Sequence, residues 1–168
     1  MGLFDFLKGY NKKENKANEK KPLDEAQSEF IKDMTSNAER ISEAYNELLG
    51  GALDYSVKSL SALDELLDQF HNNQNDIDAE MKSDVIAQAG SYIFEVARRN
   101  YGGKYYWYEH MNQPILVTGQ PNFEISIIAF DKVKMRIENG KDDQIPFYFK
   151  GYEERVKSGK NGDKTMIT

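Results

Sequence analysis

The sequence predicts an α+β fold in which several amphipathic helices pack on a small, mainly antiparallel sheet. Apolar residues recur at spacings of three and four over residues 24–49, 57–70 and 77–100, as on one face of an α-helix. Two short segments follow at 104–110 and 113–118, rich in aromatic and β-branched residues and separated by a turn, as in a β-hairpin. A chain of 168 residues is long enough to bury one core.

The three predicted helices have recognisable ends. Gly50-Gly51 ends the first, and Asp54 or Ser56 is placed to cap the second. Residues 53–55 between them are a candidate third strand. The third helix carries two adjacent apolar stripes, which indicates burial on more than one side. Glycine is unfavourable inside a helix, so Gly90 predicts the close approach of another element.

The C-terminal third is less distinct. Residues Glu124–Phe130 have strand propensity, but the spacing of apolar residues favours a helix from about Ile127 to Asn139. Asp143 or Gln144 is expected to cap a last helix with Pro146 in its first turn. Residues 158–168 are predicted to be a frayed polar tail.

Charge divides the chain into a basic arm and an acidic domain. Residues 1–21 hold six lysines and three acidic residues, about +3, so the remainder carries about −9 of the total −6. We expect a flexible Lys-rich arm over 1–21 and a single domain over 22–157. The arm begins with the apolar residues Leu3, Phe4, Phe6 and Leu7. One interpretation is a weak anchor that contacts anionic lipid. The other is a flexible terminus whose apolar side chains either pack on a neighbouring molecule or have no packing partner.

Composition excludes several classes of site. The chain has no cysteine, so disulfides, thiolate zinc sites and cysteine nucleophiles are excluded. The acidic domain argues against nucleic-acid binding. The two histidines lack metal-site spacing, and no P-loop or GxGxxG sequence is present, so we expect no metal and no cofactor. Neither a membrane-spanning run nor a secretory signal is visible, which predicts a cytoplasmic protein.

The candidate binding residues are Tyr105, Trp107, Tyr108, Glu95 and Arg98. Four consecutive aromatic residues, 105–108, cannot all face one core. Either both faces of the sheet are covered, or some of these side chains bind a partner. Glu95 and Arg98 lie three residues apart on the third helix and can pair. Glu95 is either a buried acceptor for Tyr55, Ser56 or an indole N–H, or a catalytic carboxylate with a raised pKa.

The order of these segments resembles a family of small uncharacterised bacterial domains. The resemblance rests on LDYSxxSLxxLDxLLD, AGSYIFEVARRN, a Gly-Gly pair with an aromatic strand, QPILVTGQP and a terminal helix pair, over Leu53–Tyr152. The matching positions are Asp54, Tyr55, Ser56, Leu60, Leu63, Asp64, Gly90, Tyr92, Glu95 and Trp107. The resemblance implies a fold and a bacterial source, but no activity.

Three functions remain open from the sequence. The favoured one is a non-enzymatic protein-interaction module that binds an unidentified protein partner through the aromatic strand. Its acidity suits a basic partner, as in an inhibitor or immunity protein. The first alternative is a small-ligand binder or enzyme with a site near Glu95, Arg98 and Trp107. The second is a membrane-peripheral adaptor that acts through residues 1–21.

Overall fold

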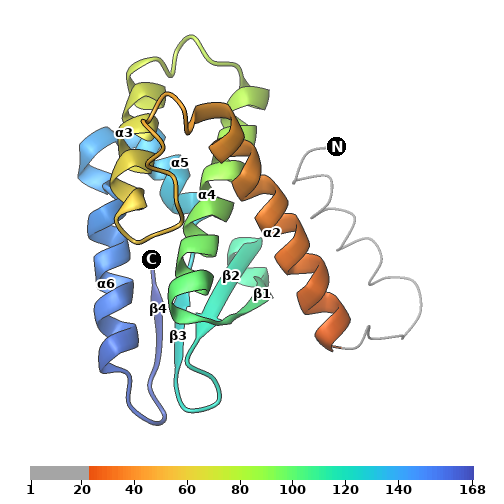
Figure 1. Cartoon of the computed structure of the whole chain (residues 1–168). Coiled ribbons are helices and arrows are strands. Elements are labelled where there is room, and N and C mark those ends of the chain that lie inside the picture. Colours follow the sequence, from red (N-terminus) through yellow and green to blue (C-terminus); the bar gives the residue numbers. More distant parts are fainter. Residues whose placement is uncertain (1–22) are drawn as a thin grey trace.

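The computed structural model of the chain describes residues 23–168, and this part has the predicted α+β fold (Figure 1). The sheet is mixed, with β1–β2 and β2–β3 antiparallel and β3–β4 parallel. The helices are α2 (Leu23–Tyr45), α3 (Ser59–Asn72), α4 (Ala79–Tyr101), α5 (Phe130–Asn139) and α6 (Ile145–Ser158). The strands are β1 (Lys104–Tyr108), β2 (Gln113–Thr118), β3 (Glu124–Ile127) and β4 (Lys164–Ile167), in that spatial order.

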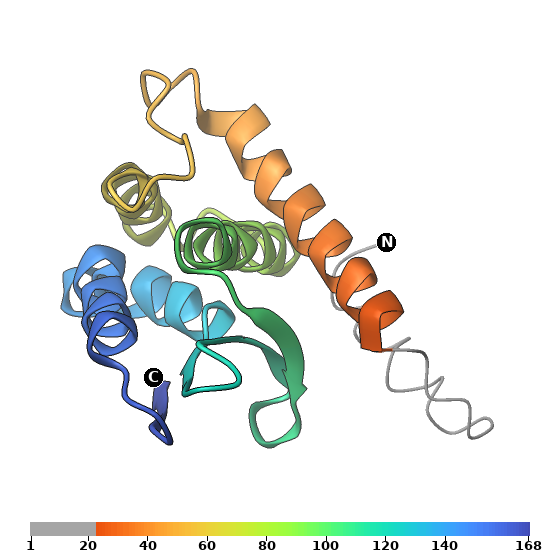
Figure 2. The ribbon, with the colours of Figure 1, turned by 60° about the horizontal axis from the view of Figure 1, so that its bottom comes forward.

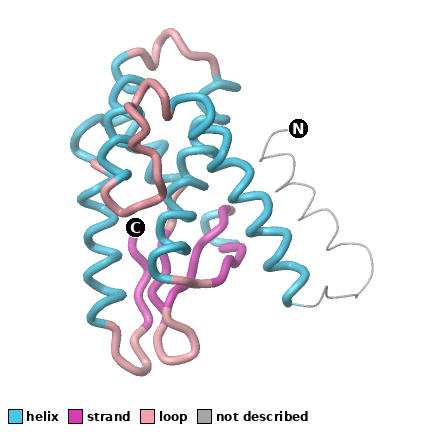
Figure 3. The backbone as a smooth tube through the Cα atoms, viewed as in Figure 1, coloured by secondary structure: helices cyan, strands magenta, loops and turns pink. Residues whose placement is uncertain are grey.

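All the described helices lie on one side of the sheet, so the molecule has a helical side and a sheet side (Figures 1, 2 and 3). The helix α4 passes through the middle of the helical side, with α2 on one flank and α3, α5 and α6 on the other. From Val85 to Val96 only Gln88 on α4 is not buried, which confirms the prediction from its two apolar stripes.

Gly90 is where α5 meets α4, as its position in the third helix predicted. A Cβ atom at this position would lie 2.3 Å from Cδ1 and 3.4 Å from Cα of Phe130. The absence of a side chain therefore lets the first residue of α5 pack against the central helix.

Two predictions for the segments between helices need correction. Residues 53–55 form no strand, and Tyr55 instead adopts a left-handed backbone with φ of 62° inside a turn. The α6 helix takes no cap from the side chain of Gln144 or Asp143. Its first amide, Ile145 N, donates to Asp64 Oδ1 of α3 at 2.8 Å. The Ser56 hydroxyl does accept from Ser59 N at 3.2 Å, as expected at the start of α3.

The C-terminal third also differs from its prediction. Residues 124–127 form the strand β3, and the helix α5 begins at Phe130, three residues later than the favoured helix from about Ile127. The prediction of a frayed tail over 158–168 is wrong for residues 164–167. These residues pair with β3 in parallel, from Lys164 opposite Glu124 to Ile167 opposite Ile127.

Candidate functional site

Alternation along β1 separates its aromatic side chains between the two faces of the sheet. Tyr105 points into the helical side, where it is 1% exposed and stacks on Phe30 with ring centroids 5.9 Å apart. Trp107 shares that face by the period-two rule, and its indole N–H is buried without a partner. The same rule places Tyr106 and Tyr108 on the opposite face of the sheet.

Strand register assembles an apolar surface around these two tyrosines. Tyr106 lies opposite Ile115, and Val117 lies opposite Ser126, which in turn lies opposite Met166. Ile115 and Val117 face away from the helices, yet they are only 7% and 6% exposed. We call this surface the open sheet face, and it comprises Tyr106, Tyr108, Ile115, Val117, Ser126 and Met166. The charged residues Lys104, Glu124 and Lys164 continue it on neighbouring positions of the same strands.

The outer edge of β1 is partly closed by α2. The Gln27 side chain accepts from Tyr105 N at 2.8 Å and donates to Tyr105 O, as a neighbouring strand would. Backbone groups of alternate residues point the same way in an antiparallel strand, so Trp107 N–H and C=O also face this edge. Gln27 leaves room there for only a short added strand.

Glu95 lies behind the sheet as a fully buried carboxylate with five hydrogen bonds. Arg98 donates twice at 2.8 Å, and Arg99 Nε donates at 3.0 Å. Tyr105 OH donates at 2.9 Å and Thr35 Oγ1 at 3.3 Å. Burial alone would raise the pKa of Glu95, but hydrogen bonds from Arg98, Tyr105 and Arg99 outweigh it and lower the pKa.

This arrangement makes Glu95 a structural acceptor that joins α2, α4 and β1. Its partners are not Tyr55, Ser56 or an indole N–H, as the sequence suggested, but Thr35, the two arginines and Tyr105. The structure therefore brings Glu95, Arg98 and Tyr105 together. It places Trp107 further along the β1 edge and Tyr108 on the open sheet face.

A second buried ion cluster was not identified from the sequence. Arg136 of α5 is 1% exposed and donates to Asp64 at 2.9 and 3.1 Å and to Asp68 at 2.9 Å. Because Asp64 also accepts from Ile145 N, this cluster joins α3, α5 and α6. The available signal was Asp64 beside Leu63 in the apolar stripe of α3, where an unpaired carboxylate would be unfavourable.

The remaining candidates give no metal or membrane-spanning site within residues 23–168. His71 Nδ1 lies 2.7 Å from Ile137 O, and His110 is exposed. Among the described residues, no three histidine or acidic side chains are grouped to hold a metal ion. None of the described helices combines the length and apolarity that crossing a bilayer requires. The anchor candidates Leu3, Phe4, Phe6 and Leu7 lie outside the described residues.

Comparison with protein-family models, with curated proteins and with solved structures finds no match to this chain. The resemblance to small bacterial domains therefore stays a prediction, and the function has to be argued from the geometry of the site.

Proposed function

We propose that this domain is a protein-interaction module that binds a protein partner on the open sheet face. The observation that carries the proposal is the one-sided placement of the helices (Figure 2), because strand alternation puts the partly exposed Tyr106 and Tyr108 on the other face of the sheet. Tyrosine is enriched at protein interfaces because it combines a large apolar ring with a polar end. Tyr106 and Tyr108 remain half-buried on this face, so both rings can lose further exposed area to a partner.

The face supports binding better than the edge of β1 does. Full pairing of an added strand needs successive free backbone groups along the edge. Gln27 already occupies those of Tyr105, so only the Trp107 end is left for such pairing. A partner that packs on the face needs no change at Gln27. The acidic character of the domain as a whole favours the approach of a basic partner, while the charged residues at the face itself are Lys104, Glu124 and Lys164.

The enzyme or ligand alternative has less support at Glu95. A general acid at neutral pH needs a raised carboxyl pKa, and here hydrogen bonds from Arg98, Tyr105 and Arg99 outweigh the effect of burial and lower the pKa of Glu95. The same bonds use the acceptor positions that a ligand would need.

Affinity purification of the full chain from its native cell tests the proposal. Tyr106→Glu and Tyr108→Glu place a charge on the open sheet face. Phe147→Glu is the matched control, because Phe147 is 81% exposed on α6, on the helical side. We expect a partner that binds the unmodified chain and the control at equal stoichiometry and is lost from both tyrosine variants.

Two controls make the result decisive. Amide NMR spectra of all three variants verify that each is folded. Recovery of the same partner with both tyrosine variants would refute the proposal, and so would equal loss with Phe147→Glu.

A further inference from the structure

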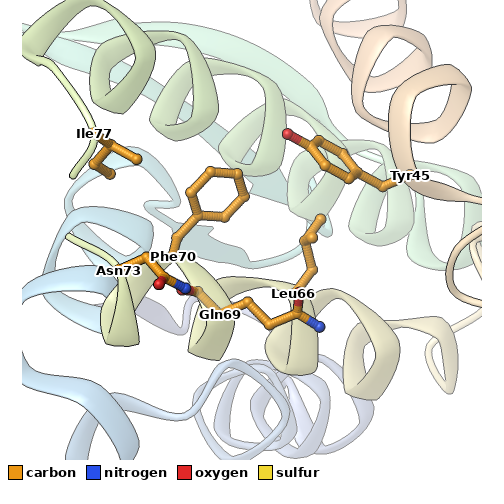
Figure 4. A pocket seen from close by; sticks show the side chains of 6 residues that line it. All are labelled: Tyr45, Leu66, Gln69, Phe70, Asn73 and Ile77. Carbon is orange, nitrogen blue, oxygen red and sulfur yellow. The ribbon is translucent and has the colours of Figure 1, made fainter.

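An apolar hollow lies among the helices α2 and α3 and the loop before α4 (Figure 4). It forms where the end of α2 meets the second half of α3 and the loop before α4, and its volume is about 180 Å³. Its lining consists of Tyr45, Leu66, Gln69, Phe70, Asn73 and Ile77. The rings of Tyr45 and Phe70 meet edge to face with centroids 5.9 Å apart. Since an apolar cavity of roughly 150 Å³ accommodates benzene, the hollow has room for one phenyl ring.

The segments that form this hollow are strongly acidic. Residues 43–47 and 65–78, which carry its lining, contain six acidic residues and no lysine or arginine. One of the six, Asp68, pairs with Arg136. Five remain without that partner: Glu43, Glu47, Glu65, Asp76 and Asp78. An occupant that suits an apolar hollow with acidic surroundings carries an aromatic side chain beside several positive charges.

We propose that the occupant is the chain's own segment 3–7, with Phe4 or Phe6 in the hollow and the following lysines beside the acidic segments. This segment combines two phenylalanines with lysines at 8, 12, 13, 16, 20 and 21. It is also tethered to the domain, which gives it a high effective concentration at the hollow.

The connecting chain is long enough for this contact. The hollow adjoins Tyr45, at the opposite end of α2 from Leu23. A helix of 23 residues spans about 33 Å at 1.5 Å per residue. Residues 8–22 can extend to about 50 Å at roughly 3.3 Å per residue, so they can run back along the whole of α2.

Paramagnetic NMR on the full chain tests the contact. The chain has no cysteine, so Gly2→Cys provides one site for a nitroxide label. We expect the label to reduce the amide signals of Gln69, Asn73 and Ile77 at least twofold relative to the reduced label. The amide of Lys164, on β4, should keep its intensity.

Matched variants decide whether the hollow and the phenylalanines cause that effect. Phe4→Ser with Phe6→Ser removes both rings, and Gln69→Lys places a positive charge on an exposed lining residue without altering the core. Each is expected to restore the lost signal. Broadening that these variants leave unchanged, or that reaches Lys164 equally, would overturn the proposal. Broadening between a labelled chain and a separate ¹⁵N chain would overturn it as well, because the arm would then bind a second copy.

Discussion

Removing the carboxylate of Asp64 is the sharpest test of how the helices are held together. In Asp64→Ala, Arg136 keeps its buried charge but loses hydrogen bonds of 2.9 and 3.1 Å, and Ile145 N loses its acceptor at 2.8 Å. Removing one partner of a buried ion pair costs about 3–5 kcal/mol. Asp68 still accepts from Arg136 Nη2, which places the expected loss near the lower limit, at about 3 kcal/mol.

Urea denaturation measures this loss directly, because Trp107 is the only tryptophan and packs partly buried against the core. Asp68→Ala is the control, since the Asp68 side chain is 28% exposed and its pair with Arg136 should contribute only about 1 kcal/mol. The double variant Asp64→Ala with Arg136→Met should be more stable than Asp64→Ala alone, because no uncompensated charge remains. The reasoning fails if Asp64→Ala costs less than the Asp68 control.

Three further predictions concern packing and ionisation. Gly90→Ala should lower the free energy of unfolding by about 1–3 kcal/mol despite the better helix propensity of alanine, because its Cβ would overlap Phe130; a more stable variant in urea would contradict this. The folded-state pKa of Glu95 is lowered, so its stabilisation is present above the unfolded value of 4.5 and is lost as pH falls through the folded value. Glu95→Gln should therefore lose less free energy of unfolding on acidification than the unmodified chain does. The same pH dependence of stability in both proteins would refute the lowered pKa of Glu95. Burial raises the pKa of Tyr152 to about 12. In an absorbance titration, Tyr152→Phe should therefore lack one phenol that ionises after the exposed tyrosines. The stability of the unmodified chain should fall between pH 10 and 12, because the folded state disfavours the ionised phenol. Loss of an early-ionising phenol instead would contradict that value.

The local features of the fold were predictable, and the pairings between distant segments were not. The spacing of Leu60, Leu63 and Leu67 identifies α3, because helix periodicity depends only on neighbouring residues. Strand β4 was missed because its sequence, KTMI, is a strand only through pairing with residues 40 positions earlier. Such pairing leaves no periodic signal in four residues.

The same limit applies to the candidate site. The burial of Glu95 followed from its place beside the apolar stripes, but its bond to Tyr105 depends on how β1 folds back onto α4. Alternation along a strand implies that Tyr106 and Tyr108 share a face. It did not predict that this face carries no described helix, which depends on where α2, α5 and α6 pack.

The parallel pairing of β3 with β4 has a consequence for how the chain folds during synthesis. The β1–β2 hairpin pairs segments that are close in sequence, so it can form early. Ile125 of β3 must wait for Thr165, which lies 40 residues later in the chain. Until residues 164–167 are made, β3 is an exposed edge that can pair with strands of other chains. Pairing with β4 therefore covers an edge of β3 that would otherwise favour aggregation.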